Sequence, residues 1–396
     1  MYLKPFPFKS ISWSTASKQS ITFYHGTVKA YLSAATVENV DITIDSSTIG
    51  KPNSNKGNIY GGGAIAQVLN NTNIQIINNS IVYGNVFGGA IYSSSGNILI
   101  DSSTFRNNNA TYGGAVYIAG DFANITDSRF AMCVVYGYDG GAIYIKGVNA
   151  SISETSFAMN NANGTESRGG SINIQGDYAH IYNCDFDRCI AYEGGVIYVN
   201  GSHAEIDGYS CNRSLALNDG GAIYIAGDYV SVSNFPITNT NATHDGGALY
   251  VTGNHVNVTN SSFARCIAYN GDGGCIFVSG LDALIANSTF TQNRVVGPNS
   301  RGGSIDVLGD GTRIIKCDFD HCTAWEGGVI YVEGSNVIIN HTTALYTNAL
   351  NDGGGIYIAG NHVTVDDLKG WFNNATNAGG TIYVEGNDTK IHDAEI

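Results

Sequence analysis

A pair of adjacent glycines recurs along this chain at a nearly constant interval, and that interval limits the possible folds more than any other feature. The first glycine of each pair follows the previous one at spacings between 25 and 29 in the sequence. Each pair opens a stretch such as Gly140-Gly-Ala-Ile-Tyr-Ile145, followed by a turn glycine, a short apolar alternation and Phe-x-x-Asn. A unit this short cannot bury an apolar face alone, so neighbouring units must stack. The first glycines are Gly62, Gly88, Gly113, Gly140, Gly169, Gly194, Gly220, Gly246, Gly273, Gly302, Gly327, Gly353 and Gly379.

The residue pattern within each unit favours β-strands. Its apolar runs are short, β-branched and interrupted by Gly and Asn, whereas helical repeats need apolar residues at helical spacing. In a strand, Ile143 and Ile145 would face inward and Tyr144 outward. Three short strands and three turns account for one unit. We therefore predict an all-β fold: a single right-handed parallel β-helix over residues 30–396, with about fourteen coils, after an N-terminal cap or linker over residues 1–29.

A longer repeat lies over the short one. The spacings 27-29-25-26-26 occur twice, so a block of five coils that begins at Gly113 is repeated from Gly246, at a period of 133 positions. Stacking should align equivalent residues into columns, with Phe inside and, three residues later, an inward Asn or Cys that serves the turn amides. The Phe column is Phe105, Phe130, Phe157, Phe186, Phe263, Phe290 and Phe319, and the turn column is Asn108, Asn160 and Asn293 with Cys133, Cys189, Cys266 and Cys322.

Composition excludes several classes of partner. The chain has 33 Asp and Glu against 19 Lys and Arg, a net charge of −14, whereas nucleic acids and anionic membrane surfaces are bound by basic faces. The sequence has no apolar run of about 18 residues that could span a bilayer as a helix. Asn-x-Ser/Thr sequons favour an extracellular glycoprotein and a piece of a longer secreted protein over a cytoplasmic one, although Asn, Ser and Thr are also common turn residues. Such sequons begin at Asn109, Asn149, Asn241, Asn287 and Asn374.

The repeat resembles two families of surface proteins. The pairing of Gly-Gly-Ala-Ile with Phe-x-x-Asn is similar to the repeat of the chlamydial polymorphic outer-membrane proteins. The fuller Gly-Gly-Ala-Ile-Tyr-Ile…Asn-Ser-Thr-Phe form resembles the adhesin-like surface proteins of methanogenic archaea. The similarity covers Gly62 to Gly386, most of the chain. It implies a right-handed parallel β-helix displayed at the cell surface, in adhesion to a glycan or protein on another surface.

An aromatic residue two positions after the Ala of each repeat defines the first candidate site. By alternation these rings should face outward, and an exposed ladder of rings would suit sugar or protein binding. The alternative is a stack that merely protects one face of the sheet. The column is Tyr92, Tyr117, Tyr144, Tyr198, Tyr224, Tyr250, Phe277, Tyr331, Tyr357 and Tyr383.

The column is interrupted twice, at Asn173 and at Asp306, one five-coil period apart. Both interruptions follow the longest turns, and an arginine precedes the glycines of each. We predict two equivalent notches that could bind ligand. The alternative is a pair of Arg–Glu ladders that neutralise stacked charge. The first notch would contain Arg168, Asn173, Tyr192 and Glu193, and the second Arg301, Asp306, Trp325 and Glu326.

Two further groups of residues could carry chemistry. Asp219, Asp245 and Asp272 precede successive double glycines and should stack as like charges, which a Ca²⁺ ion would relieve. No other cofactor is predicted. The cysteine pairs Cys184/Cys189 and Cys317/Cys322 leave disulfides and buried thiols equally open, and without His in matching columns they do not suggest zinc.

The sequence favours a non-enzymatic binding module. Many β-helices process polysaccharides, and the outward pairs Asp185/Asp187 and Asp318/Asp320 have a spacing that glycosidase carboxyls use. Both pairs belong to the duplicated block, however, and no coil departs from the repeat with an acid and a base at one level. A polysaccharide lyase or hydrolase is therefore the alternative. A structural fibre subunit that associates head to tail through an open coil end is the third.

Overall fold

The double glycine forms a turn whose backbone conformation and close contacts exclude residues with a side chain. The computed structural model describes residues 90–93 and 97–396 and, before them, the backbone of the eight strands β1–β8; the double glycines at Gly62 and Gly88 lie outside this part. Gly273 has a φ of +61°, and a Cβ on Gly274 would overlap the carbonyl oxygen of Gly303. The first glycine therefore supplies a left-handed turn and the second a close contact with the next coil.

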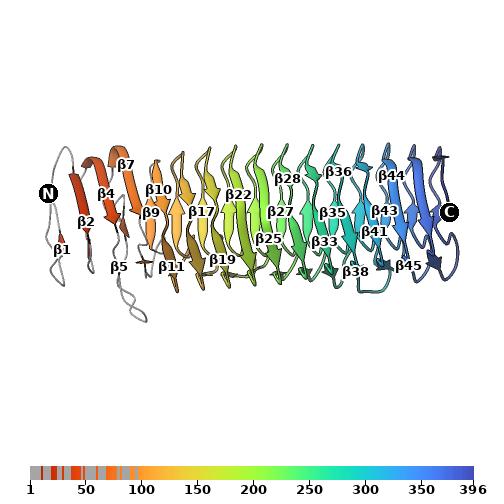
Figure 1. Cartoon of the computed structure of the whole chain (residues 1–396), viewed down its shortest axis with the longest axis horizontal. Coiled ribbons are helices and arrows are strands. Elements are labelled where there is room, and N and C mark those ends of the chain that lie inside the picture. Colours follow the sequence, from red (N-terminus) through yellow and green to blue (C-terminus); the bar gives the residue numbers. More distant parts are fainter. Residues whose placement is uncertain are drawn as a thin grey trace. The chain divides into compact units, whose positions relative to one another are not determined.

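The chain forms two compact units, residues 1–192 and 193–396, and each is a parallel β-solenoid. In both units, three strand regions recur in every coil and pair in parallel with the equivalent strands of the next coil (Figure 1). We name them the glycine sheet, which follows the double glycine, the long sheet, which carries the Phe column, and the short sheet, which follows the inward Asn or Cys. The part of the chain that the structure describes has no helix, and so none that could cross a membrane.

In the first unit, the strand β2, which falls in the segment predicted as a cap or linker, pairs in parallel with β4. A separate pair consists of β1 (Ser10–Ile11) and β3 (Lys29–Ala30). The glycine sheet comprises β6 (Ile59–Tyr60), β9 (Ile91–Ser93), β13 (Val116–Ile118), β17 (Ile143–Ile145) and β21 (Ile172–Ile174). The long sheet comprises β2 (Gln19–Tyr24), β4 (Val37–Asp45), β5 (Thr48–Ile49), β7 (Val68–Ile77), β8 (Ile81–Val82), β10 (Ile98–Asp101), β11 (Thr104–Arg106), β14 (Asn124–Thr126), β15 (Arg129–Ala131), β18 (Ser151–Ser153), β19 (Ser156–Ala158) and β22 (His180–Asp187). The short sheet comprises β12 (Asn109–Ala110), β16 (Val134–Tyr136), β20 (Asn161–Asn163) and β23 (Ile190–Ala191).

The second unit repeats this arrangement. Its glycine sheet comprises β24 (Ile197–Val199), β27 (Ile223–Ile225), β31 (Leu249–Val251), β35 (Ile276–Val278), β39 (Ile305–Val307), β43 (Ile330–Val332), β46 (Ile356–Ile358) and β49 (Ile382–Val384). Its long sheet comprises β25 (Glu205–Asn212), β28 (Ser231–Ser233), β29 (Pro236–Thr238), β32 (Asn257–Thr259), β33 (Ser262–Ala264), β36 (Leu284–Ala286), β37 (Thr289–Thr291), β40 (Arg313–Ile315), β41 (Asp318–Asp320), β44 (Ile338–Leu345), β47 (Thr364–Trp371) and β50 (Lys390–His392). Its short sheet comprises β26 (Leu215–Ala216), β30 (Asn241–Ala242), β34 (Ile267–Ala268), β38 (Arg294–Val295), β42 (Thr323–Ala324), β45 (Asn348–Ala349) and β48 (Asn374–Ala375).

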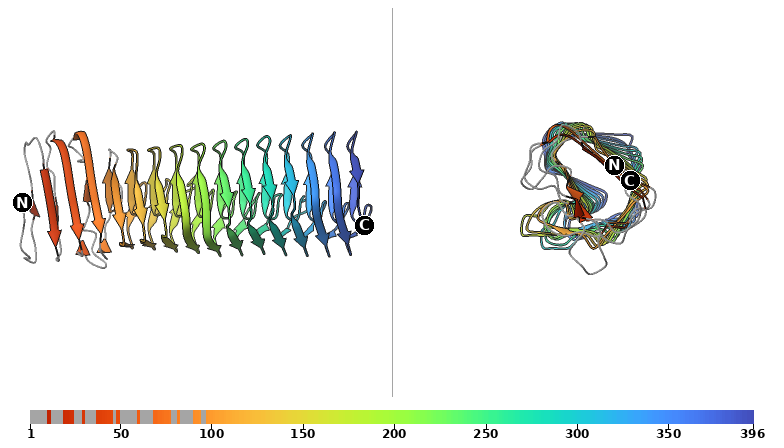
Figure 2. Two further views of the ribbon diagram at one scale, coloured as in Figure 1. Left: turned by 45° about the horizontal axis from the view of Figure 1, so that its top comes forward. Right: turned by 90° about the vertical axis from the view of Figure 1, so that its left-hand side faces the viewer.

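The core is made of the predicted columns. Phe290 is fully buried, and its ring stacks between those of Phe263 and Phe319 at centroid distances of 5.0 and 4.7 Å. The inward Asn column is also confirmed: Asn293 is fully buried and its Oδ1 accepts the backbone N–H of Cys266 at 2.9 Å. Viewed along the coil axis, the coils of each unit overlie one another (Figure 2).

Two left-handed residues bend most of the described coils on either side of the strand that carries the Phe column. In the coil of Phe290 they are Asn287, with a φ of 50°, and Gln292, with a φ of 56°. Each is followed by an inward polar residue, Ser288 or Asn293, that accepts a backbone N–H from the preceding coil. Inward polar side chains thus satisfy backbone N–H groups at the corners. The left-handed residue itself points outward, and its type varies from coil to coil.

Candidate functional site

The tyrosine column lies on the outer side of the glycine sheet, but it is not the exposed ladder that the sequence predicted. Tyr224 and Tyr250 are half-buried, and Tyr144 and Tyr198 each retain 6% of their surface. Stacking at ring distances of 4.8 to 5.3 Å covers the faces, as between Tyr117 and Tyr144 at 5.3 Å, and burial raises the pKa of Tyr250 to about 12. The prediction that the rings are exposed is therefore wrong for Tyr144 and Tyr198. Alternation determines on which side of a strand a side chain lies, but it does not determine how much of that side chain neighbouring residues bury.

The second predicted notch, in the second unit, is an ion cluster. The Arg301 guanidinium donates to Asp272 Oδ2 from Nε (3.2 Å) and Nη2 (3.0 Å), and from Nη1 to Glu333 Oε2 at 2.8 Å. Its Cζ lies 4.7 Å from the ring centroid of Tyr331. Burial lowers the pKa of Arg301, but the charges of Asp306 and Asp272 outweigh this and leave it raised.

Asp306 lies beneath this arginine in the aromatic column, in register with Phe277 in the coil before and Tyr331 in the coil after. It is fully buried, and neither carboxylate oxygen has a hydrogen-bond partner. Burial raises its pKa well above the ordinary value, and nearby Arg301 partly offsets this. Trp325 is half-buried and Glu326 accepts from Asn351 at 2.8 Å. Arg301 and Asp306 thus meet as predicted, but the arginine is committed to partners within the fold, which favours the charge-neutralising alternative.

The residues of the first predicted notch fall in two units: Arg168, Asn173 and Tyr192 in the first, and Glu193 in the second. Asn173 is fully buried and accepts a hydrogen bond from Gln175 Nε2 at 2.6 Å, while its own Nδ2 has no partner. The backbone N–H of Arg168 donates to Asp139 at 2.9 Å. Asn173 therefore occupies the buried position that Asp306 takes in the second copy of the block.

The three aspartates that precede successive double glycines, Asp219, Asp245 and Asp272, have a structural role that the sequence did not reveal. Asp219 Oδ1 accepts the backbone N–H of Asp245 at 3.0 Å, and Asp245 Oδ1 accepts that of Asp272 at 2.7 Å. Asp272 in turn accepts the N–H of Arg301 at 2.7 Å. Burial raises the pKa of Asp219 to about 6 against the hydrogen bond from Asp245. No cluster of three or more His, Cys, Asp or Glu suited to a metal ion occurs in the described residues, so the Ca²⁺ site stays a prediction.

The two cysteine pairs, for which the sequence left both states open, are buried thiols and not disulfides. Cys184, Cys189, Cys317 and Cys322 are all free and fully buried. The partners of a pair stand at opposite ends of a strand, five residues apart, which at about 3.3 Å per residue, less the bend at the corner, is on the order of 13 Å between Cα atoms, whereas a disulfide tolerates about 7 Å. Instead, Ser171 Oγ donates to Cys189 Sγ at 2.9 Å and Ser304 Oγ to Cys322 Sγ at 3.0 Å.

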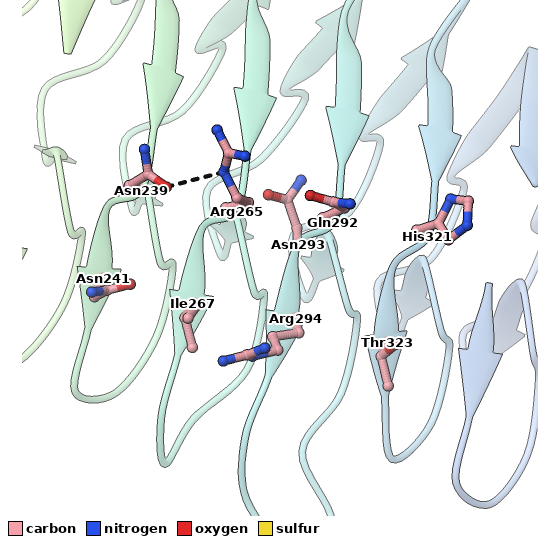
Figure 3. Close-up of a pocket in the computed structure, with 9 residues that line it drawn as sticks. All are labelled: Asn239, Asn241, Arg265, Ile267, Gln292, Asn293, Arg294, His321 and Thr323. Carbon is pink, nitrogen blue, oxygen red and sulfur yellow. Dashed lines mark hydrogen bonds between the residues drawn. The ribbon is translucent and has the colours of Figure 1, made fainter. Parts of the chain in front are cut away.

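A groove on the outside of the second unit is the site that sequence reasoning missed. It has a volume of about 560 Å³ and runs across four coils (Figure 3), within the range of about 300–1,000 Å³ typical of ligand sites. One row of its side chains comes from the left-handed corner of each coil and the other from the short sheet. The corner row is Asn239, Arg265, Gln292 and His321, the sheet row is Asn241, Ile267, Arg294 and Thr323, and Asn293 lies between them.

The lining combines amides, a hydroxyl, an apolar floor and cations, with no carboxylate. Arg265 is held in place because its Nε donates to Asn239 Oδ1 at 3.0 Å. Ile267 offers the apolar contact, half-buried between Asn241 and Arg294 in register on the neighbouring strands. The residues of the corner row each lie one position before an inward residue of the turn column. That position could therefore have indicated this outward surface from the sequence.

A row of exposed rings continues from the groove along the corner column. The ring of His321 stacks on Tyr346 at 5.1 Å, and Tyr346 stacks on Phe372 at 4.9 Å. Tyr346 and Phe372 are 49% and 73% exposed, and His321 Nδ1 contacts Asp320 Oδ1 at 2.7 Å. The groove therefore ends at the ring of His321, one face of which is covered by Tyr346.

No family model, curated protein or solved structure matches the chain in the three comparisons made with known proteins. The groove and the row of rings are therefore the features from which a function can be inferred.

Proposed function

We propose that this chain is a non-enzymatic, extracellular binding module that holds a carbohydrate in the groove of its second unit. The observation that carries the proposal is the groove lining. The side-chain amides of Asn241 and Gln292 each offer donors and an acceptor, as the neighbouring hydroxyls of a sugar require. Ile267 and the His321 ring supply the apolar surface that sugar C–H groups need.

The proposal moves the binding surface from the glycine sheet to the groove and keeps the predicted class of function. Stacked rings such as Tyr117 and Tyr144 turn their faces to one another, so they offer little free ring face to a sugar. The groove is concave and contacts a ligand from two rows at once. Its lining lacks the paired carboxyls of a glycosidase, which supports binding over hydrolysis. Surface display in adhesion, as in the archaeal and chlamydial proteins that the repeat resembles, is part of this proposal.

A glycan array with purified full-length chain tests it. We expect binding by the parent chain and loss of binding on Ile267→Glu, which places a carboxylate in the groove floor. Val134→Glu is the matched control, because Val134 occupies the equivalent short-sheet position in the first copy of the block. Retained binding by Ile267→Glu, or no bound glycan for the parent, would contradict the proposal. Release of reducing ends from a bound glycan would favour the enzymatic alternative.

A further inference from the structure

Two arginines of the groove have no anionic partner in a chain rich in acid. The chain has 33 Asp and Glu against 19 Lys and Arg, yet within residues 97–396 neither Arg265 nor Arg294 forms an ion pair. Arg265 donates to the neutral Asn239, and Arg294 is exposed. Arg301, by contrast, engages Asp272 and Glu333. The groove therefore retains two guanidinium groups with unused donors.

The two arginines line the groove from different rows of adjacent coils. Arg265 is on the corner row, and Arg294 is on the sheet row of the next coil, in register with Ile267. Figure 3 shows the Arg294 side chain directed toward the coil of Ile267, whereas the Arg265 guanidinium is turned toward Asn239. An anion bound in the groove would lower the repulsion between these two positive charges.

The duplicated block shows that the fold does not need these arginines. The equivalent residues of the first copy are Met132 and Asn161, both uncharged. The inward residues beside them are the same in both copies. The backbone N–H of Cys133 donates to Asn160 Oδ1 at 3.0 Å, and that of Cys266 donates to Asn293 Oδ1 at 2.9 Å. Two copies of one scaffold thus differ in charge on the outer surface of the corner.

We propose that the groove selects a glycan that carries isolated acidic sugars, with Arg265 and Arg294 binding the carboxylate. This inference rests on the proposed carbohydrate function and names the ligand class. A planar guanidinium donates two parallel hydrogen bonds to a carboxylate. The net charge of −14 repels a dense polyanion, so the acidic sugars are separated by neutral ones that contact the amides and Ile267.

Calorimetric titration of the full chain with three matched oligosaccharides tests the inference. The first contains one uronic acid, the second is its carboxyl-reduced neutral form, and the third carries a sulfate ester in place of the carboxylate. We expect the uronate form to bind on the order of tenfold tighter than the neutral form, as charge-assisted hydrogen bonds provide, and its affinity to fall with added salt. A sulfate preference over the uronate would overturn the carboxylate assignment.

The block supplies the variants. Arg265→Met and Arg294→Asn introduce the residues of the first copy, and each should reduce the preference for the uronate severalfold with the unfolding midpoint unchanged. Arg313→Gln, an exposed arginine on β40 outside the groove, is the charge-matched control. Equal binding of uronate and neutral forms would overturn this inference and leave carbohydrate binding standing. Failure of every glycan, with binding of an acidic peptide instead, would overturn both.

Discussion

Arg301 Nε lies 3.8 Å from Asp306 Oδ2, and Asp306 takes a place in the column where neighbouring coils have aromatic rings. The carboxyl is fully buried and the arginine side chain is 25% exposed. Asp306 has no hydrogen-bond partner, and Arg301 is the nearby positive charge that partly offsets the rise of its pKa on burial. The same arginine contacts Asp272 and Glu333, so one guanidinium supports three acidic groups.

We predict that Asp306→Asn maintains or raises stability, whereas Arg301→Ala lowers it. The amide copies Asn173 of the first block and removes a buried carboxyl that has no hydrogen-bond partner, whereas loss of the arginine removes the positive charge that offsets the burial of Asp306, at a cost of about 3 kcal/mol. In urea unfolding, Arg301→Ala should be at least about 1 kcal/mol less damaging in the Asp306→Asn background. Additive effects of the two substitutions would show that the groups do not interact.

Asp219 should make stability depend on pH. Its folded-state pKa of about 6 lies above the unfolded value of about 3.9. Between these values the native chain holds a proton that the unfolded chain has lost, so stability falls as the pH rises from about 4 to about 6. Asp219→Asn keeps the acceptor for the Asp245 N–H and should raise stability above pH 6, by no more than about 1 kcal/mol after allowance for solvent screening.

Thermal unfolding of parent and variant at pH 4 and pH 7.5 measures this effect. The gap between their midpoints should widen at the higher pH. Asp228→Asn is the control for amide substitution itself, because Asp228 also accepts a backbone N–H from the next coil, that of Asn254 at 2.7 Å. A gap between Asp219→Asn and the parent that is equal at both pH values would contradict the prediction.

The columns of the solenoid were predictable because each is set by a period in the sequence. Ile143, Phe290 and Asn293 are inward at positions that alternation and coil length determine. Tyr144 is buried although its outward side was predicted correctly, since its exposure depends on packing by Tyr117 and by Tyr112, whose ring lies 5.4 Å away. Sequence period says nothing about how much of an outward side chain its neighbours cover.

The groove was missed for a related reason. It forms where the left-handed residues Arg265 and Gln292 bend their coils, and neither is a residue type that marks a left-handed turn from sequence. The state of the Cys pairs stayed open for a different reason: a C-x4-C spacing is compatible with a disulfide in a loop, but the strand between Cys317 and Cys322 holds them apart.

All eight cysteines should titrate as free thiols on unfolding and as unreactive thiols in the native chain. Burial raises the pKa of Cys184 and of Cys317 to about 12, so these two form little thiolate at neutral pH, and all eight sulfurs are buried and inaccessible to reagent. A chromogenic disulfide reagent should detect eight thiols in denaturant and almost none without it. Reductant should not change the unfolding midpoint. Four missing thiols in unreduced, denatured protein would instead establish the two disulfides.

The sequon at Asn241 leads to a prediction that joins glycosylation to binding. Asn241 lines the groove beside Ile267, whereas Asn287 is an exposed corner residue outside the groove lining. A glycan attached at Asn241 would occupy the space that we assign to the ligand. Chain produced in a host that glycosylates this sequon should therefore bind the uronate oligosaccharide at least about tenfold more weakly than unmodified chain, a difference of about 1.4 kcal/mol.

Thr243→Ala removes that sequon and leaves Asn241 in place, so it should restore binding in the glycosylating host. Ser288→Ala would disturb the corner bond to Ser261, so Asn287→Gln is the better control for the second sequon, and it should change nothing. Mass spectrometry of each preparation establishes which sites are occupied. Full affinity in chain that carries a glycan at Asn241 would show that ligand binds elsewhere, because the attached sugar and the bound sugar cannot share one groove.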